Sequence, residues 1–304
     1  MQSEDHAVLA DFPLVLEEGT WQLLAQQAEQ LAAEALTAEA ELLGRPELHA
    51  RLGLPRSLRK ALRRCDPENA PLGCARVMRF DFHLTREGWR ISEVNSDVPG
   101  GFIEAAGFAE LMAEHYPECT PPPNPARLYA DAIAAAAGEA AAVGLVHATA
   151  HSDDAQVMHY LGQELSVRGM RAIMIAPNHL RWNSGVARIA SSFAAASPAA
   201  LVRFFPAEWL PNLGPQAIWE PWFCGGRTAM SNPASAILIQ SKRFPLAWDE
   251  LATPVATWRA LLPETKEPSA LPTTWSADWV LKPVLGRVGE SVAVPGVTAA
   301  PVLA

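Results

Sequence analysis

The spacing of hydrophobic residues changes along the chain, and the first two patterns predict a long helix and a β-hairpin. Residues 14–43 have apolar side chains three and four positions apart, as in an amphipathic helix, with Thr20 as the expected N-cap. Residues 75–84 and 89–96 alternate apolar and polar side chains, and Gly88 between them can supply the positive φ of a short turn. We therefore expect these two segments to pair as antiparallel strands.

The middle of the chain has a different pattern. The stretch "CTPPPNP", residues 119–125, interrupts any regular element and is the expected domain boundary. Residues 143–177 then read as strand, helix and strand, with Ser152 or Asp153 as the helix N-cap and Gly169 at the C-terminal end of the helix. This order predicts a small α/β domain with a parallel sheet. The expected divisions are residues 1–120, 121–214 and 215–304.

Composition and charge exclude several kinds of partner. The 304 residues are 49% hydrophobic and 19% charged, as in a globular protein, and the formal net charge is −9. Because the sequence has no continuous block of basic residues, nucleic acid is not an expected partner. No apolar run approaches the roughly 20 residues of a membrane helix, so we expect a cytoplasmic protein without a membrane partner. The cysteines lack C-x-x-C spacing, which argues against a zinc site and a disulfide framework.

The predicted hairpin contains the residues with the most specific chemistry. Side chains two apart on a strand share a face, so Arg79 and Asp81 lie together on the first strand, and Glu93 and Asn95 on the second. A five-residue connection, residues 85–89, would set Asp81 opposite Glu93, whereas a one-residue slip would put them on opposite faces. In the first register Asp81, Glu93 and Asn95 converge as the oxygen ligands that Mg²⁺ prefers, and Arg79 can stabilise charge on a phosphoryl group. The alternative is a hairpin whose charges are only solvated.

The motifs in this hairpin resemble those of a known family. "R-F-D-F" followed by "E-V-N-S-D-V-P-G-G" is similar to the metal-binding hairpin of ATP-grasp ligases. Here the hairpin precedes a lysine-bearing segment, "VLKPVLGRVGE", and this order resembles the circularly permuted arrangement of glutathionylspermidine synthases. "RFFPAEW" at residues 203–209 and "QSKRFPLAW" around Lys242 are similar to two further stretches of that family. The resemblance spans residues 79–289 and implies an α/β (α+β) fold, ATP-grasp-like with an inserted small α/β, pre-ATP-grasp-like domain.

The resemblance also implies an activity. It points to an ATP-dependent carboxylate–amine ligase that forms an amide bond through an acyl phosphate, with ATP and Mg²⁺ as cofactors and a small peptide or amino acid as substrate. A solvated surface lysine remains the alternative for either of the two lysines that the motifs contain. The implied roles are metal binding by Asp81, Glu93 and Asn95, charge stabilisation by Arg79, and nucleotide binding by Lys242, Lys282, Gly286, Arg287 and Gly289.

Some features depart from the family pattern or leave its reading open. Gly100 and Gly101 stand where the glutathionylspermidine synthases have hydroxyl-bearing residues, which argues against glutathione itself as the substrate. Ser96 and Asp97 are candidate substrate contacts, although Asp97 could instead cap the following helix. The sequence ends at Ala304, before the strands that would complete the adenine side, so the activity of this chain by itself stays open. A non-catalytic binding or scaffold protein is therefore the alternative to a ligase, with a phosphotransferase as a third possibility; the sequence does not predict an oligomeric state.

Overall fold

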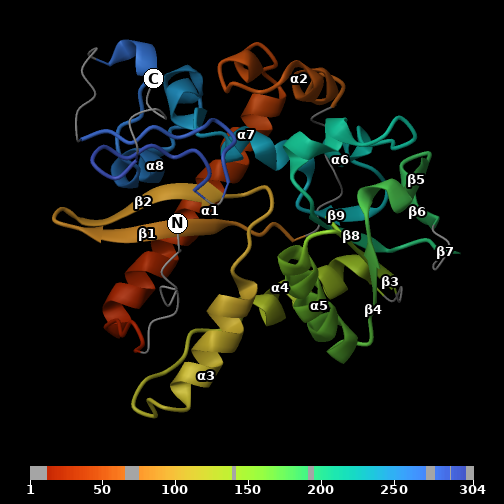
Figure 1. Ribbon diagram of the computed structural model, residues 1–304, viewed down its shortest axis with the longest axis horizontal. Coiled ribbons are helices and arrows are strands. Elements are labelled where there is room, and N and C mark those ends of the chain that lie inside the picture. Colours follow the sequence, from red (N-terminus) through yellow and green to blue (C-terminus); the bar gives the residue numbers. More distant parts are fainter. Residues whose placement is uncertain are drawn as a thin grey trace, which may run out of the picture.

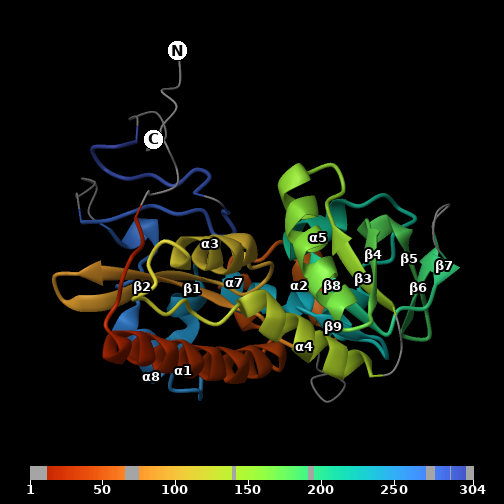
Figure 2. The ribbon, with the colours of Figure 1, turned by 90° about the horizontal axis from the view of Figure 1, so that it is seen from below.

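The protein is a mixed α/β structure in which a long helix supports the hairpin (Figure 1). The computed structural model describes residues 12–65, 75–138, 142–190, 195–271, 278–287 and 289–298. Helix α1 (Glu18–Leu43) crosses behind the hairpin in Figure 1 and runs beneath it in Figure 2. Thr20 lies inside this helix and the N-cap is Glu17, so the prediction of Thr20 as the cap is wrong. The helix begins before Thr20 and therefore uses that residue in its first turn.

The predicted hairpin forms from β1 (Arg79–Thr85) and β2 (Gly88–Asn95). Asp81 pairs with Glu93, and the first residue of β1 pairs with the last residue of β2. The register expected from the sequence is therefore confirmed. Its polar face carries the candidate metal ligands, because alternation places the apolar residues of both strands on the opposite face against the core.

The route to this register differs from the prediction. Thr85 pairs with Gly88, so the turn holds only two residues instead of a five-residue connection. Phe82 then pairs with Ile91, and the pairing shifts by one residue between Asp81 and Phe82. Ser92 is the extra residue of this β-bulge, and without it the tight turn would set Asp81 opposite the residue before Glu93.

The small parallel sheet was predicted correctly in its main elements. Its strand order is β4-β3-β8-β9, and every neighbouring pair is parallel. Gly169 has a φ of 75° after the helix between β3 and β4, as expected for a C-terminal glycine. The N-cap of that helix is His151 without a side-chain bond, so the prediction of Ser152 or Asp153 is wrong because the helix already includes both. The elements are β3 (Ala142–His147), α5 (Ser152–Val167), β4 (Arg171–Ile175), β8 (Ala200–Phe204) and β9 (Ala229–Ser231).

Helices cover the sheet, and one short sheet was not predicted. Helix α4 (Pro125–Ala137) has Asn124 as its N-cap, and the Asn124 side chain accepts hydrogen bonds from two backbone N–H groups of the first turn. In Figure 2, α4 and α5 lie beside the parallel sheet. The additional antiparallel sheet consists of β5 (Leu180–Asn183), β6 (Val186–Ala190) and β7 (Ala195–Ala196).

The last third of the chain contains short helices and few strands. The sheet continues past the predicted boundary at residue 214, because β9 belongs to it. The lysine-bearing segment near the end forms a single antiparallel bridge between Leu281 and Ala293 instead of a longer strand. Within the described residues, no helix is long and apolar enough to cross a membrane. The remaining helices are η1 (Leu48–Ala50), α2 (Arg56–Leu62), η3 (Glu104–Phe108), α3 (Ala109–Ala113), η4 (Pro177–His179), η5 (Ala207–Asn212), α6 (Pro221–Cys224), η6 (Ala234–Ala236), α7 (Ile237–Gln240), η7 (Phe244–Glu250), α8 (Ala256–Leu261) and η8 (Pro268–Ala270).

Candidate active site

The polar face of the hairpin brings the three predicted metal ligands together. Asn95 Nδ2 lies 3.5 Å from Asp81 Oδ2 and 3.4 Å from Glu93 Oε1. The two carboxylates therefore approach the same small amide group from two strands. Arg79 sits at the edge of this group, where Nε donates to Asp81 Oδ1 at 2.7 Å and Nη2 donates to Asp81 Oδ2 at 3.1 Å. The four side chains form one cluster, as the register predicted.

Two lysines from distant segments complete this cluster. Lys242 follows α7, and its Nζ lies 2.8 Å from Glu93 Oε2. Lys282 Nζ lies 3.8 Å from the same oxygen and donates to the backbone carbonyl of Ser92 at 3.2 Å. The two segments are also joined directly, because the Lys242 N–H donates to the Val284 carbonyl at 2.9 Å. Sequence reasoning predicted that both lysines belong to one site, and the structure brings both of them to Glu93.

The charges in this cluster are unequal. The structure gathers three cationic side chains, those of Arg79, Lys242 and Lys282, around the two carboxylates of Asp81 and Glu93. Each of these side chains retains some exposure, from 15% for Lys242 to 45% for Arg79, so solvent reaches the cluster. An excess of one positive charge beside oxygen ligands suits an anionic ligand.

Burial and neighbouring charge shift the pKa values of the central pair. Burial of the Glu93 carboxyl opposes its ionisation, but the hydrogen bond and charge of Lys242, together with Lys282, bring its pKa below the ordinary value. Burial of the Lys242 ammonium lowers its pKa, and the cations Lys282 and Arg287 add to this effect. The attraction of Glu93 raises the Lys242 pKa but does not outweigh burial. The Lys242 ammonium therefore loses its proton more readily than an exposed lysine, although it contacts Glu93.

A cavity of about 740 Å³ adjoins the cluster. Glu93, Lys242 and Lys282 are in its wall, and the aromatic rings of Phe244 and Trp258 supply part of the apolar lining. A volume between roughly 300 and 1,000 Å³ with a few converging polar groups is typical of a small-molecule site. The cavity thus has charged side chains that could contact a phosphate beside apolar side chains that could contact the rest of a larger ligand.

The ligand chemistry of the cluster fits Mg²⁺. Asp81 and Glu93 offer carboxylate oxygens, and rotation of the Asn95 amide would turn its oxygen toward them. Magnesium is held in proteins by one or two carboxylates with waters and phosphates filling the other positions. Among the residues that the structure describes, no group of three or more His, Cys, Asp or Glu side chains could hold a metal ion. A metal here would accordingly need the amide and external oxygens as further ligands.

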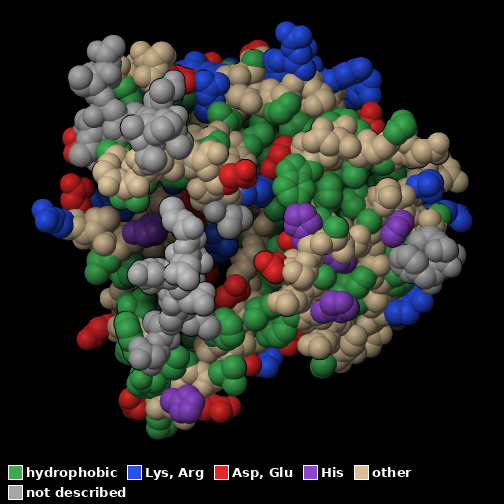
Figure 3. All heavy atoms as spheres, in the orientation of Figure 1, with side chains coloured by type: hydrophobic (Ala, Val, Ile, Leu, Met, Phe, Trp, Pro, Cys, Tyr) green, Lys and Arg blue, Asp and Glu red, His purple; other side chains and the backbone are tan. Residues whose placement is uncertain are grey.

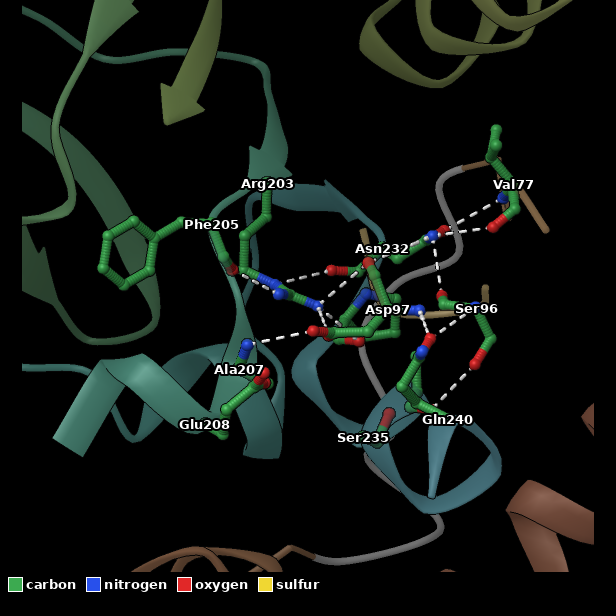
Figure 4. Close-up of polar contacts among 12 residues, drawn as sticks. Val77, Ser96, Asp97, Arg203, Phe205, Ala207, Glu208, Asn232, Ser235 and Gln240 are labelled. Carbon is green, nitrogen blue, oxygen red and sulfur yellow. Dashed lines mark hydrogen bonds and ion pairs between the residues drawn. The ribbon is translucent and has the colours of Figure 1, made fainter. Parts of the chain in front are cut away.

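Ser96 and Asp97 differ from the sequence expectation. Both side chains are 0% exposed, and Figure 4 shows them inside a network of polar contacts. Ser96 Oγ donates to the Ala236 carbonyl at 3.1 Å, while the backbone N–H groups of both residues donate to Gln240 Oε1. The local sequence could not indicate this burial, because the partners come from residues far along the chain. Neither side chain is open to a substrate in this structure, nor does Asp97 cap the helix that follows.

Asp97 instead joins a buried network of charges. Arg203 Nη2 lies 2.5 Å from Asp97 Oδ1, and both side chains are 0% exposed. Asp97 Oδ2 accepts from the Ala207 N–H at 3.0 Å, so this carboxylate also holds the start of η5. Burial opposes ionisation of Asp97, but Arg203 and Arg287 lower its pKa below the ordinary value. The network fixes the chain just after the hairpin.

Arg287 belongs to this same network and not to the open cluster. Its Nη2 lies 2.6 Å from Asp97 Oδ2, and its Nε lies 2.6 Å from Glu208 Oε1. Burial opposes the charge of Arg287, but Glu208 and Asp97 raise its pKa above the ordinary value. The sequence assigned Arg287 to the nucleotide, whereas the structure gives its guanidinium two protein carboxylates.

The predicted glycines have reasons in the backbone. The Gly286 N–H donates to the Pro283 carbonyl at 3.2 Å, and a Cβ at Gly286 would lie 3.0 Å from the Pro283 ring. Gly289 has a φ of 69°, which side chains rarely adopt. Gly101 has a φ of 95°, so the glycine that replaces a hydroxyl-bearing residue meets a conformational need. These observations account for the turn and leave nucleotide binding by Gly286 and Gly289 as a prediction.

Sequence reasoning missed two buried side chains that position the site. Gln240 Oε1 accepts hydrogen bonds from the backbone N–H groups of Ser96 and Asp97, which fixes the end of β2. Gln240 lies two residues before Lys242 in the sequence. Asn232 accepts from the Val77 N–H at 2.9 Å and donates to the Val77 carbonyl at 2.8 Å, which fixes the approach to β1. The only sequence signal was the closeness of Gln240 to Lys242 within "QSKRF".

Comparison with known proteins agrees with this arrangement. Residues 10–300 match the family described as "Glutathionylspermidine synthase preATP-grasp". No curated protein matches the chain. The matched range includes the hairpin, the parallel sheet and both lysine-bearing segments, and it extends the resemblance seen in the sequence toward the N-terminus. The chain belongs to the glutathionylspermidine synthase preATP-grasp family.

Proposed function

We propose that the protein acts as an ATP-dependent carboxylate–amine ligase on a small peptide or amino-acid substrate. The observation that carries this proposal is the convergence of two lysines and Arg79 on Asp81 and Glu93 beside the cavity. Membership of the glutathionylspermidine synthase preATP-grasp family supports the same reaction class. Phosphoryl transfer needs cations and alignment more than covalent catalysis, and this cluster supplies three cations.

Each side chain of the cluster has a distinct role in this proposal. Lys242 and Lys282 would bind phosphate oxygens, and Arg79 would stabilise the charge that develops on the transferred group. Asp81, Glu93 and Asn95 would hold Mg²⁺, which supplies further neutralisation of phosphate charge when bound. In this structure the cations contact the carboxylates. On binding, phosphate oxygens would replace the carboxylates as partners of the lysines and Arg79, and the carboxylates would bind the metal.

The proposed chemistry has two steps. A substrate carboxylate oxygen attacks the terminal phosphorus of ATP, and ADP leaves, which gives an acyl phosphate. The amine nitrogen then attacks the acyl carbon, phosphate leaves, and the nitrogen loses a proton as the amide forms. The cations favour both steps, because negative charge develops on ADP as it leaves in the first step and on phosphate as it leaves in the second. The apolar part of the cavity would keep water from the acyl phosphate.

A non-catalytic binding or scaffold role is the second candidate. The observation that favours it is the buried network, which occupies Asp97 and Arg287 and leaves neither for a ligand. In this alternative the lysine-bearing segment serves mainly to tie the hairpin to the parallel sheet. The two candidates differ in whether the open cluster binds nucleotide.

Calorimetry with a non-hydrolysable ATP analogue and Mg²⁺ tests the choice. A ligase should bind the analogue with a Kd between about 1 μM and 1 mM, and Lys282→Ala should weaken binding at least about tenfold. Arg188→Ala, which alters an exposed cation on β6, is the matched control and should bind like the wild type. Glu93→Gln should weaken binding of the analogue only when Mg²⁺ is present. Equal heats for the wild type and Lys282→Ala would support the scaffold role, and phosphate release that requires both a carboxylate and an amine would support the ligase.

A further inference from the structure

Helix α2 and the turn after it carry a stripe of positive charge. Five basic residues occupy helical positions i, i+3, i+4, i+7 and i+8, which share one face. The opposite face is apolar and buried, so the basic face points outward. Figure 3 shows Lys and Arg side chains gathered at the top of the molecule, where Figure 1 places α2. The basic residues are Arg56, Arg59, Lys60, Arg63 and Arg64, and the buried residues are Leu58, Ala61 and Leu62.

These five side chains line a hollow of about 410 Å³. The hollow shares no lining residue with the larger cavity beside Glu93. Within the described part of the chain, the ion pair that the stripe makes joins Arg64 to Glu220 at 3.7 Å. Arg59 Nε is buried without a hydrogen-bond partner among the described residues. The stripe thus concentrates positive charge that its described surroundings hardly neutralise.

The arrangement is unfavourable for the helix by itself. Arg56 and Lys60, Arg59 and Arg63, and Lys60 and Arg64 are like charges four residues apart, and such pairs destabilise a helix. Cations in and just after the last turn interact well with the helix dipole, and Arg59 and Lys60 lie in that turn, but this does not account for Arg56 or remove the repulsion between neighbours. The chain as a whole has a net charge of −9, so the stripe is also exceptional for this sequence. A local arrangement that lowers stability is typical of a functional site.

We propose that the basic stripe of α2 binds a small anion with several phosphate groups. Guanidinium groups match phosphate oxygens in paired hydrogen bonds, and four of the five side chains are arginines. The nine residues from Arg56 to Arg64, seven of them in α2, extend only about 12 Å, which suits two or three linked phosphates better than a long nucleic-acid backbone. The negative charge of the rest of the protein repels an extended polyanion or an anionic membrane, while a small ligand contacts the stripe alone.

Calorimetry with inorganic tripolyphosphate, without Mg²⁺ and at about 50 mM salt, tests the site. A variant with Lys242→Met and Lys282→Met serves as the background, so that the candidate nucleotide site contributes less to phosphate binding. In that background we expect the affinity for tripolyphosphate to fall at least tenfold in a triple variant with Arg56→Gln, Lys60→Gln and Arg64→Gln. The matched control is Arg86→Gln, Arg171→Gln and Arg188→Gln, which removes the same charge from exposed positions elsewhere and should stay within twofold.

Thermal unfolding separates binding from a structural role. Without anion, the triple α2 variant should have a Tm equal to or above that of its background, because like-charge pairs are removed. Added tripolyphosphate should raise the Tm of the background but not that of the α2 variant. A lower Tm of the α2 variant without anion, or equal tripolyphosphate affinity in the two proteins, overturns the proposal. Tighter binding of duplex DNA or anionic vesicles at the same ionic strength overturns the assigned class of ligand.

Discussion

Asn95 and Asp97 are two residues apart, yet they belong to two polar clusters with opposite surroundings. The open cluster consists of Arg79, Asp81, Glu93, Asn95, Lys242 and Lys282, and the buried network consists of Asp97, Arg203, Glu208 and Arg287. In the open cluster the Arg79 and Asp81 side chains are 45% and 27% exposed. In the buried network the Arg203 and Asp97 side chains are both 0% exposed.

Contact distances do not separate these clusters. Lys242 lies 2.8 Å from Glu93, and Arg287 lies 2.6 Å from Asp97. Burial separates their carboxylates, because Glu93 is 25% exposed and Asp97 is 0% exposed, whereas Lys242 and Arg287 are similar at 15% and 16%. Partly exposed ion pairs contribute little to stability and can exchange partners with a ligand. A charge without solvent must keep its partner, since separation leaves an uncompensated charge in the interior. We therefore expect ligand binding at the open cluster and structural support from the buried network.

The largest expected effect comes from breaking the buried network. Arg203→Leu removes the charge that faces Asp97 and the donors to the Phe205 and Asn232 carbonyls. We expect the free energy of unfolding to fall by about 3 to 5 kcal/mol, measured by urea denaturation. In the open cluster, Arg79→Leu is the matched substitution and should change it by less than about 1 kcal/mol. Equal losses for the two variants would remove the distinction between the clusters.

Arg287→Gln tests whether the buried network also positions the open cluster. The substitution removes charged hydrogen bonds to Asp97 and Glu208, so we expect a loss of about 2 to 3 kcal/mol in unfolding free energy. Because the segment with Arg287 also carries Lys282, nucleotide binding should weaken even where the protein remains fully folded. Calorimetry at low temperature measures this second effect. Unchanged nucleotide affinity in the folded variant would show that the two clusters are independent.

The open cluster was more predictable from the sequence than the buried network. Alternation grouped Arg79 with Asp81 and Glu93 with Asn95 on their strands, and that information is local. The predicted register then set Asp81 opposite Glu93, although the connection expected for it was too long. Asp97 and Arg287 are 190 residues apart, so nothing in either segment indicates their contact. The bulge at Ser92 was also missed, because a tight turn with a bulge and a longer connection give the same pairing at Asp81.

Other parts of the fold followed the same rule. The βαβ unit was predicted because strand and helix periods succeed each other within a short segment. The β5–β6 hairpin was missed although Ser184 and Gly185 both have positive φ, as a two-residue turn between twisted strands requires. The sequence "NSG" was the available signal for that turn. Local patterns thus predicted elements, while contacts between distant segments decided which charges became buried.

Lys242→Met separates ligand binding from stability within the open cluster. Removing this cation should weaken binding of the ATP analogue by about tenfold, or about 1.4 kcal/mol, because a phosphate group loses its cationic partner. The unfolding free energy should change less, since burial already disfavours the charged form of Lys242 and Glu93 keeps Lys282 nearby. Calorimetry and urea denaturation on the same preparation measure the two quantities. A loss of stability that exceeds the loss of binding free energy would assign Lys242 to the support of the fold.

The smallest effect is a pH dependence that should differ between the clusters. The pKa values of Asp97 and Glu93 both lie below their ordinary values in the folded protein. Each carboxylate therefore contributes stability that is present above its unfolded pKa, about 3.8 for Asp97 and 4.5 for Glu93, and is lost as pH falls through the folded pKa. The stability difference between the wild type and Asp97→Asn should shrink clearly between pH 5 and pH 2, measured by urea denaturation. The corresponding difference for Glu93→Gln should shrink by less than about 1 kcal/mol, because solvent screens this half-buried group. A larger acid-dependent change for Glu93→Gln than for Asp97→Asn would contradict the division into an open and a buried cluster.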